Sequence, residues 1–308
     1  FWAFPPSAPN STEWSGKGKR SLLKVEQVAA IVVALVWVSL LILESVFPLR
    51  KRKRPRTRRF AINLCLSGLA LGMGALAVRP VALGLSTWAS GRRFGLLHIV
   101  EFPSAAQLVV GFLLLDLTFY YWHRANHGFA ILWRFHNVHH VDPDLDVSTA
   151  FRFHFGEVLY STGFRALQVS LLGISPAVLI IYEIVFQCAT IFHHSNMRIP
   201  IRVERWLNMI FVTPRMHGIH HSIVENETNS NYSVIFRWWD AIHRSLRLNI
   251  HQADITIGVA AYQAPSDNTL QNLFALPFLR QREYWRLPGG RYSVREEALR
   301  EAQSELRE

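Results

Sequence analysis

Long apolar runs, separated by short polar segments, follow one another along the first two thirds of the chain. Residues 28–43 carry no charge, and with their flanks, 25–47, they are long enough as a helix to cross a hydrocarbon layer about 30 Å thick. A second run, 61–78, continues weakly towards residue 90, and a third, 105–122, ends in aromatic residues typical of a membrane interface. The pattern predicts about three transmembrane helices.

Residues 158–174 and 176–192 form a fourth apolar region that differs from the first three. Gly173 and Pro176 break it in the middle, and polar side chains interrupt both halves. Because lipid-facing helices rarely carry such residues, we expect a helical hairpin that enters the membrane and returns. The remaining chain is polar and ends in a charged segment, 293–308, which we expect to be a solvated helix.

Composition and charge agree with a membrane protein. Half of the residues are hydrophobic, 18% are charged and the mean hydropathy is +0.14, which argues against a water-soluble globule. The net charge of +11 depends on one run, residues 50–59, that holds eight Lys and Arg residues and no acid. A nucleic-acid surface would spread its charge, so we expect no nucleic-acid partner. Fewer cations precede the first span than follow it, which predicts that the run lies in the cytoplasm.

Histidines are the main candidates for chemistry, because the two cysteines, Cys65 and Cys188, are too few for a thiolate metal site. Most of the fourteen histidines fall into groups with helical spacing. Residues three or four apart share one face of a helix, so each group aims imidazoles at a common point. The grouped residues are His123, His127, His136, His139, His140, His193, His194, His217, His220 and His221.

Each histidine group follows an apolar segment that returns the chain to the same side of the membrane. So many imidazoles exceed the ligands that one ion takes, and two metal ions are expected. His154 and His193 are candidates for direct ligation or for a supporting role. Carboxylates that accept hydrogen bonds from ligand rings would fix their tautomers. The candidates for this role are Asp116, Asp142, Asp144, Asp146, Glu157 and Asp240.

These inferences combine into one predicted fold. We expect an all-α integral membrane protein with about three transmembrane helices and a membrane helical hairpin. A cytosolic helical cap is expected to carry a histidine-ligated dinuclear metal site. Residues 1–94 are predicted to be an N-terminal transmembrane region, 95–265 a catalytic domain and 266–308 a C-terminal cytosolic tail.

The ordered motifs resemble the fatty acid hydroxylase and sterol desaturase superfamily, in particular its bacterial members. The resemblance covers roughly residues 95–265 and rests on the segments HRANH, LWRFHNVHH, DLDVSTAFRFH, FHHSN, TPRMHGIHHS and NYSVIFRWWD. Two departures are Phe155, where the family commonly has proline, and residues 243–245 in place of Phe-Gly-Thr. The resemblance implies a non-haem dinuclear iron centre, with zinc as a substitute metal. The implied ligands are His123, His127, His136, His139, His140, His194, His217, His220 and His221.

The resemblance also implies O2-dependent oxidation of a C–H bond in a lipid, either fatty acyl, sterol or related, by hydroxylation or desaturation. The sequence has no cysteine cluster and no Gly-rich dinucleotide motif, so electrons are expected from a separate reductase with a ferredoxin or a b-type cytochrome. The basic run, 50–59, either docks an acidic donor of this kind or only contacts anionic lipid. We expect the active site on the cytoplasmic face of a bacterial inner membrane.

Two other classes of protein remain open. A membrane metal transporter would use histidines to mark its permeation path, with ionisable residues near the middle of several spans. A zinc-dependent membrane hydrolase would need an open metal position and a general base, for which Glu157 is the candidate.

Overall fold

The computed structural model describes residues 16–100 and 103–295, with side chains from residue 25 onward. All regular structure in this part of the chain is helical, and extended segments meet only in isolated bridges. The α-helices are α1 (Gly16–Val46), α2 (Arg56–Met73), α3 (Arg79–Arg92), α4 (Ser104–Gly128), α5 (Ala130–His140), α6 (Phe155–Leu172), α7 (Pro176–His194), α8 (Ile201–Leu207), α9 (Pro214–His220), α10 (Glu225–Thr228), α11 (Trp238–Ile242) and α12 (Leu270–Ala275). A π-helix, η1 (Gly74–Val78), joins α2 to α3. Short 3-10 helices are η2 (Leu96–His98), η3 (Val147–Thr149), η4 (Ala260–Tyr262), η5 (Pro265–Asn268) and η6 (Leu276–Phe278).

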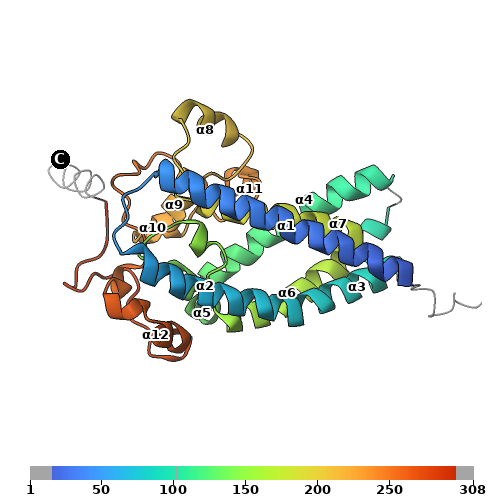
Figure 1. The fold of residues 1–308 in the computed structure, drawn as a ribbon, viewed down its shortest axis with the longest axis horizontal. Coiled ribbons are helices and arrows are strands. Elements are labelled where there is room, and N and C mark those ends of the chain that lie inside the picture. The colour runs from blue at the N-terminus through green and yellow to red at the C-terminus, as the bar shows by residue number, and fades with distance from the viewer. Residues whose placement is uncertain (1–15, 101–102, 296–308) are drawn as a thin grey trace, which may run out of the picture.

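Four helical segments are long and apolar enough to cross a membrane. They are Val25–Val46 in α1, Arg56–His98 through α2 and α3, Ser104–Gly128 and Pro176–His194. Figure 1 shows these helices and α6 as an elongated bundle, with α8 to α12 gathered at the end where α1 stops and α2 begins. The first three segments correspond to the three predicted transmembrane helices, and the fourth is the second arm of the predicted hairpin.

The hairpin of α6 and α7 turns where the sequence predicted it. Gly173 ends α6 with a positive φ of 72°, a conformation that glycine adopts without strain. Ser175 then accepts a hydrogen bond from the Val178 N–H at 3.4 Å, and Pro176 begins α7. Gly95, with φ 105°, lies so close to this turn that an added Cβ would overlap the backbone of Gly173. The loop after α3 and the hairpin turn are therefore locked together.

The helix that runs from Arg56 to Arg92 continues past a proline. Pro80 has no N–H, so it cannot donate to the carbonyl four residues earlier. The widened turn of η1 stands just before it, and the Arg79 N–H donates to the Gly74 carbonyl, five residues earlier, as in a π-helix. The weak apolar continuation towards residue 90 is thus a continuous helix in the structure.

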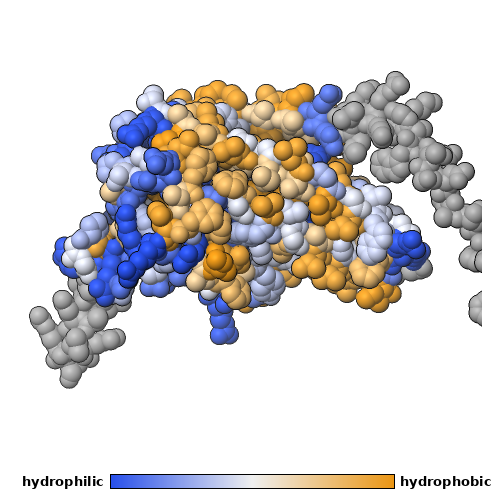
Figure 2. Space-filling model, turned by 90° about the horizontal axis from the view of Figure 1, so that it is seen from below, coloured by the Kyte–Doolittle hydropathy of each residue, from blue (hydrophilic) through white to orange (hydrophobic). Residues whose placement is uncertain are grey.

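The bundle core lies where α4, α6 and α7 meet. Leu115, Val169 and Leu179 are completely buried there. The outward faces of the long helices are also apolar: Val28 is 60% exposed and Leu35 is 62% exposed. Figure 2 shows apolar residues over much of this face, with hydrophilic residues concentrated towards the end of the bundle that carries the short helices. Such an apolar exterior suits a lipid environment rather than water.

The basic run between α1 and α2 is partly used inside the protein. Arg59 is only 6% exposed, and its guanidinium donates to Asp142 at 2.7 Å. The Arg50 guanidinium donates to the Gln252 side chain at 2.6 Å. Neither sequence interpretation of this run, lipid contact or docking of an electron donor, included these internal contacts. They arise because loops from distant parts of the chain fold against the start of α2, whereas Arg58 stays exposed.

The segment predicted to be a cytosolic tail packs onto the helical body. Leu273 of α12 and Leu276 are buried in one cluster with Trp133 of α5. Residues 293–295 are not helical, and the remainder of the predicted terminal helix, 296–308, lies outside the described residues.

Candidate metal centre

Four separate segments bring the predicted histidines to one end of the bundle. The last turns of α4 carry His123 and His127, and α5 carries His136, His139 and His140. The end of α7 carries His193 and His194. The helix α9 carries His217 and His220, and His221 follows it directly. All of these side chains are buried or nearly so.

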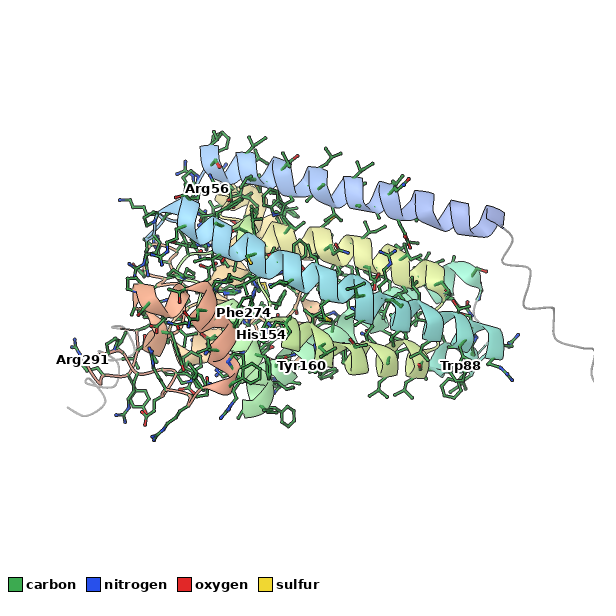
Figure 3. All side chains as sticks on the ribbon, turned by 60° about the horizontal axis from the view of Figure 1, so that its bottom comes forward. Arg56, Trp88, His154, Tyr160, Phe274 and Arg291 are labelled. Atoms are coloured by element: carbon green, nitrogen blue, oxygen red, sulfur yellow. The ribbon has the colours of Figure 1, made fainter. Side chains whose placement is uncertain are left out.

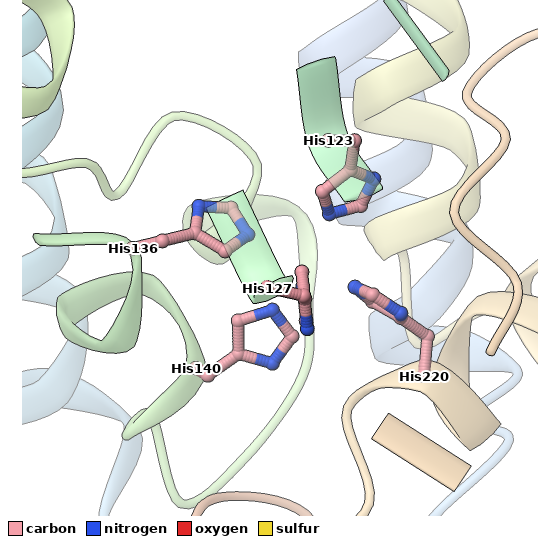
Figure 4. Close-up of side chains that lie close together, drawn as sticks. All are labelled: His123, His127, His136, His140 and His220. Atoms are coloured by element: carbon pink, nitrogen blue, oxygen red, sulfur yellow. The ribbon is translucent and has the colours of Figure 1, made fainter. Parts of the chain in front are cut away.

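The nine predicted ligands divide into two groups, and within each group one nitrogen per ring lies within 4.8 Å of all the others. We call them group one and group two. Group one is His123, His127, His136, His140 and His220, drawn in Figure 4, where the rings surround a common point. Group two is His139, His194, His217 and His221. The rings of His140 and His221 stack with centroids 4.3 Å apart, so the groups are neighbours.

Helix geometry explains how one short helix serves both groups. On α5, His136 and His140 are four residues apart, share a face and join group one. His139 lies about 100° around the same helix from His140 and joins group two. At α9 the same rule applies: His217 and His221, four residues apart, belong to group two, and His220 belongs to group one.

Backbone carbonyls orient several of these rings. A carbonyl oxygen only accepts hydrogen bonds, so the Nδ1 atom facing it carries the proton and leaves the Nε2 lone pair available to a metal. Three of the four carbonyls come from alternate residues of the segment 230–234. The pairs are His220 with Ser230 at 2.7 Å, His123 with Tyr232 at 2.7 Å, His193 with Val234 at 3.1 Å and His194 with Thr190 at 2.7 Å.

The nitrogen positions fit metal ions. In group one, both ring nitrogens of His127 and His140 and the Nε2 atoms of His136 and His220 are buried without a hydrogen-bond partner. Such groups are costly unless a partner satisfies them. In group two, the Nε2 of His194 lies 3.0 Å from the Nε2 atoms of both His139 and His217. Nitrogens bound to one metal at about 2.1 Å and at right angles lie about 3.0 Å apart.

The protonation state of the histidine rings also favours metal binding. Burial, reinforced by the neighbouring imidazoles, holds the pKa of His139, His140 and His221 well below the usual value. These rings are therefore neutral near pH 7, as metal ligation requires. A set of neutral nitrogen donors suits iron, zinc, copper or nickel and disfavours magnesium and calcium.

Among the carboxylates predicted to support the ligands, Glu157 contacts a histidine. Its Oε1 lies 2.8 Å from the Nδ1 of His136, and the Nε2 of that ring faces group one. Asp240 acts one step further away: its carboxylate accepts the N–H groups of Tyr232 and Ser233 at 2.9 Å each. It thereby holds the segment 230–234, which supplies the carbonyls.

The other four predicted carboxylates bind elsewhere. Asp116 accepts a hydrogen bond from the Trp239 indole at 2.8 Å. Asp142 and Asp146 pair with Arg59, and Asp144 accepts the backbone N–H of Lys53 at 2.8 Å. Backbone carbonyls take the place expected for these acids. Asp142, Asp144 and Asp146 lie away from the rings because the loop that follows α5 turns back towards α2.

His154 and His193 lie outside the two groups. The Nδ1 of His154 accepts the Gly156 N–H at 3.0 Å and caps α6, while its other nitrogen lies 3.3 Å from the Phe274 carbonyl. Figure 3 shows His154 beside Phe274. His193 is packed against group two, with its ring centroid 4.1 Å from that of His217, and it lines the cavity described next.

A cavity of about 390 Å³ runs from the histidines into the bundle between α2, η1, α6 and α7. At the histidine end it is lined by members of both groups, and further along by Phe119, Phe164 and Phe186. Residues of η1 line its side. The sequence analysis named none of these apolar lining residues, since a lining residue and a core residue have the same apolar pattern.

Other contributors to the site were also missed by sequence reasoning. Arg59 was counted with the surface cations, and the carbonyls of segment 230–234 carry no side-chain signal. The one available hint was the position of this segment inside the motif NYSVIFRWWD.

Residues 108–245 match the family model described as fatty acid hydroxylase. This region contains all nine histidines of the two groups. This region is thus similar to a fatty acid hydroxylase domain. The predicted resemblance to the fatty acid hydroxylase and sterol desaturase superfamily is thereby confirmed.

Curated relatives of the chain act on lipids, as their names state. The chain is 34% identical to an ornithine lipid hydroxylase of Rhizobium tropici, over 46% of this chain and 42% of that protein. It is 28% identical to cholesterol 25-hydroxylase of Rattus norvegicus, over 63% of this chain and 64% of that protein. It is 27% identical to human alkylglycerol monooxygenase, over 67% of this chain and 45% of that protein. The matches thus span roughly half the length of these relatives, and no solved structure matches the chain.

Proposed function

We propose that the protein is an O2-dependent membrane enzyme that hydroxylates a C–H bond of a lipid at a dinuclear non-haem iron centre. The observation that carries the proposal is the cavity with members of both histidine groups at one end and apolar side chains behind them. The curated relatives named above are all hydroxylases or monooxygenases, which favours hydroxylation over desaturation.

The proposed division of labour follows from the geometry. Group one and group two would each hold one iron ion, and iron supplies the activation of O2 when it is bound. The apolar walls at Phe119, Phe164 and Phe186 would bind a lipid chain and exclude water from the histidine end. Glu157 and the carbonyls of segment 230–234 would keep the rings in the tautomer that binds metal.

A zinc hydrolase is less well supported by this arrangement. Its general base would have to reach a metal-bound water, and the candidate was Glu157. One oxygen of this carboxylate lies against the Nδ1 of His136, and the residue is 6% exposed. Glu157 is thus placed to orient a ligand ring.

The membrane orientation and the partners belong to the same proposal. We place the histidine end at the cytoplasmic face of a bacterial inner membrane. The bias of basic residues towards the end of the first span supports the cytoplasmic side. An external reductase with a ferredoxin or a b-type cytochrome would deliver electrons at this face. Sterol, fatty acyl and other lipid substrates all remain compatible with an apolar cavity.

Metal analysis tests the centre directly. We expect about two irons per chain after anaerobic purification of the full chain in detergent. Alanine at His220 or at His217 should each remove about one iron, because the two rings belong to different groups. Alanine at the exposed His251 is the matched control and should leave the metal content unchanged. A wild-type protein that holds no iron, even after reconstitution, would refute the centre.

Lipid mass spectrometry tests the reaction. Cells that express the protein should contain a lipid with one added oxygen atom, labelled when 18O2 is supplied, and cells with His139→Ala should lack it. A product that has lost two hydrogens and gained no oxygen would show that the reaction is desaturation and not hydroxylation. Lipids identical in the two strains would overturn the proposed activity.

A further inference from the structure

The cavity has a second polar end, away from the histidines. The charged and amide side chains that line it there are Arg79, Arg165, Glu183 and Gln187. Ionisable groups at this depth of a membrane bundle are costly, and they commonly mark a place where something polar binds. The group two ligands do not extend this far, so the polar end is a separate feature of the same cavity.

Arg165 is held in a defined position. It is 9% exposed, and its guanidinium donates to the Gln168 side chain at 2.5 Å. The Gln168 amide in turn donates to Thr118 at 2.6 Å and to the Leu115 carbonyl at 3.1 Å. One side of the guanidinium is thereby fixed to α4, while the residue lines the cavity.

Glu183 faces the same space without a fixed partner. Among the described side chains, its carboxylate forms no hydrogen bond and no ion pair within bonding distance. Arg79, the other cation near it, is already paired with Glu26 at 2.8 Å. A carboxylate without a hydrogen-bond partner is stabilised by a ligand that donates a hydrogen bond to it.

The opposite charges of Arg165 and Glu183 select the chemistry of a ligand. An anionic group would be repelled by the carboxylate, and a cationic group would be repelled by the guanidinium. A hydroxyl group can accept from the guanidinium and donate to the carboxylate at the same time. A neutral hydroxyl therefore satisfies both side chains.

Helix rise gives the distance from this pair to the histidines. On α7, Glu183 precedes His194 by eleven residues, or about 16 Å. On α6, Arg165 follows Glu157 by eight residues, or about 12 Å. The apolar rings of Phe119, Phe164 and Phe186 line the cavity as well.

We propose that the substrate is a lipid with an uncharged hydroxyl group that binds between Arg165 and Glu183. The oxidised carbon then lies about 12 to 16 Å from that hydroxyl, at the histidine end of the cavity. This inference rests on the proposed function for the reaction, but the binding site itself needs no metal.

Photo-crosslinking tests the site on the full chain in lipid nanodiscs, without turnover. One probe is a long-chain primary alcohol with a diazirine beside its hydroxyl, and a second carries the diazirine at the far end of the chain. We expect the first probe to label α6 and α7 near residues 165 and 183, and the second to label residues near 157 and 190. Reversed labelling, or labelling only of lipid-facing surfaces, would overturn the inference.

Variants separate recognition from a merely structural role. Glu183→Met and Arg165→Met should each reduce labelling by the first probe about tenfold, the usual worth of a hydrogen bond to a charged group. A long-chain carboxylate should compete weakly for the wild type and more strongly for Glu183→Met, because the repulsion is gone. Methionine at the exposed Glu283 is the control and should change neither result. Unchanged labelling in both cavity variants would overturn the hydroxyl site.

The outcomes for the site and for the proposed function can be told apart. Correct labelling in a protein that binds no iron would keep the hydroxyl site and refute the iron centre. Two irons per chain, together with labelling that is the same in the wild type, Glu183→Met and Arg165→Met, would support the iron centre and refute the hydroxyl site.

Discussion

Replacing Arg59 with methionine removes a buried cation while keeping most of the volume of its side chain. The guanidinium pairs with Asp142 at 2.7 Å and with Asp146, and it also lies 3.4 Å from the Asp144 carbonyl. Arg59 and both acids are at most 6% exposed. The loop that they hold joins α5, which carries three histidines, to α6, which carries Glu157.

The expected loss in the free energy of unfolding depends on the charges that stay buried after the substitution. Removing one partner of a buried ion pair costs about 3 to 5 kcal/mol, because the other charge is left uncompensated. Here two carboxylates lose their shared partner, but Asp142 keeps hydrogen bonds from Asn63 and Thr149 at 2.8 Å each. We therefore expect Arg59→Met to lower the free energy of unfolding by about 3 to 5 kcal/mol near pH 7.

The effect should depend on pH in a defined direction. Burial acts to raise the pKa of Asp142, but the guanidinium groups of Arg59 and Arg152 outweigh it and hold this pKa below its ordinary value. A depressed pKa contributes stability above the unfolded-state value, and this stability is lost as the pH falls through the folded-state value. Without Arg59 the pKa rises, so protonation relieves the penalty at higher pH than in the wild type. The difference between the two proteins should therefore shrink as the pH falls through the raised pKa of Asp142 in the variant.

Denaturant unfolding of the protein in detergent micelles, followed by tryptophan fluorescence, measures this difference. Arg58→Met is the matched control, because Arg58 belongs to the same basic run but is exposed, and it should have little effect. A double-mutant cycle with Asp142→Asn should show strong coupling to Arg59. If the Arg58 and Arg59 variants were equally stable, the buried ion pairs of Arg59 would not stabilise the fold, and Arg59 would be equivalent to the exposed cations of the run.

Three further predictions concern the site and its scaffold. Glu157→Gln should weaken metal binding about tenfold and Glu157→Ala up to about a hundredfold, by chelator competition, because the carboxylate supports the His136 ring; equal affinities would exclude this role. Asp240→Asn should weaken binding at both groups, since the carboxylate holds the segment of carbonyls; metal titration that loses affinity at neither group would contradict it. Gly95→Ala should destabilise the fold by more than about 2 kcal/mol, since its φ is positive and a Cβ would strike Gly173; an unchanged unfolding midpoint would show that the turn can yield.

The spacing of the histidines along the sequence was enough to predict most of the candidate metal site. Neighbours at three and four residues predicted convergent rings, and the structure places nine of them in two groups. Spacing alone could not pair rings from different helices. His140 lies beside His221, and His139 beside His194, because of how α5 packs against the ends of α7 and α9.

The acids after α5 show where the sequence argument stopped. Asp142 and Asp146 follow the histidines closely along the chain, which suggested contact with the rings. The loop instead folds towards α2, where Arg59 attracts both carboxylates. Proximity in sequence says little about partners when a loop is free to turn either way, and the nearest compensating charge decided the outcome.

The apolar lengths, the break at Gly173 and the helical registers of the histidines were determined by the sequence itself, because local backbone geometry converts spacing directly into helix faces. The division of the rings into two groups, the carbonyls that orient them and the cavity leading to Arg165 and Glu183 were decided only by the tertiary structure. These features join segments far apart in the chain, and such contacts depend on how whole helices pack rather than on any local pattern.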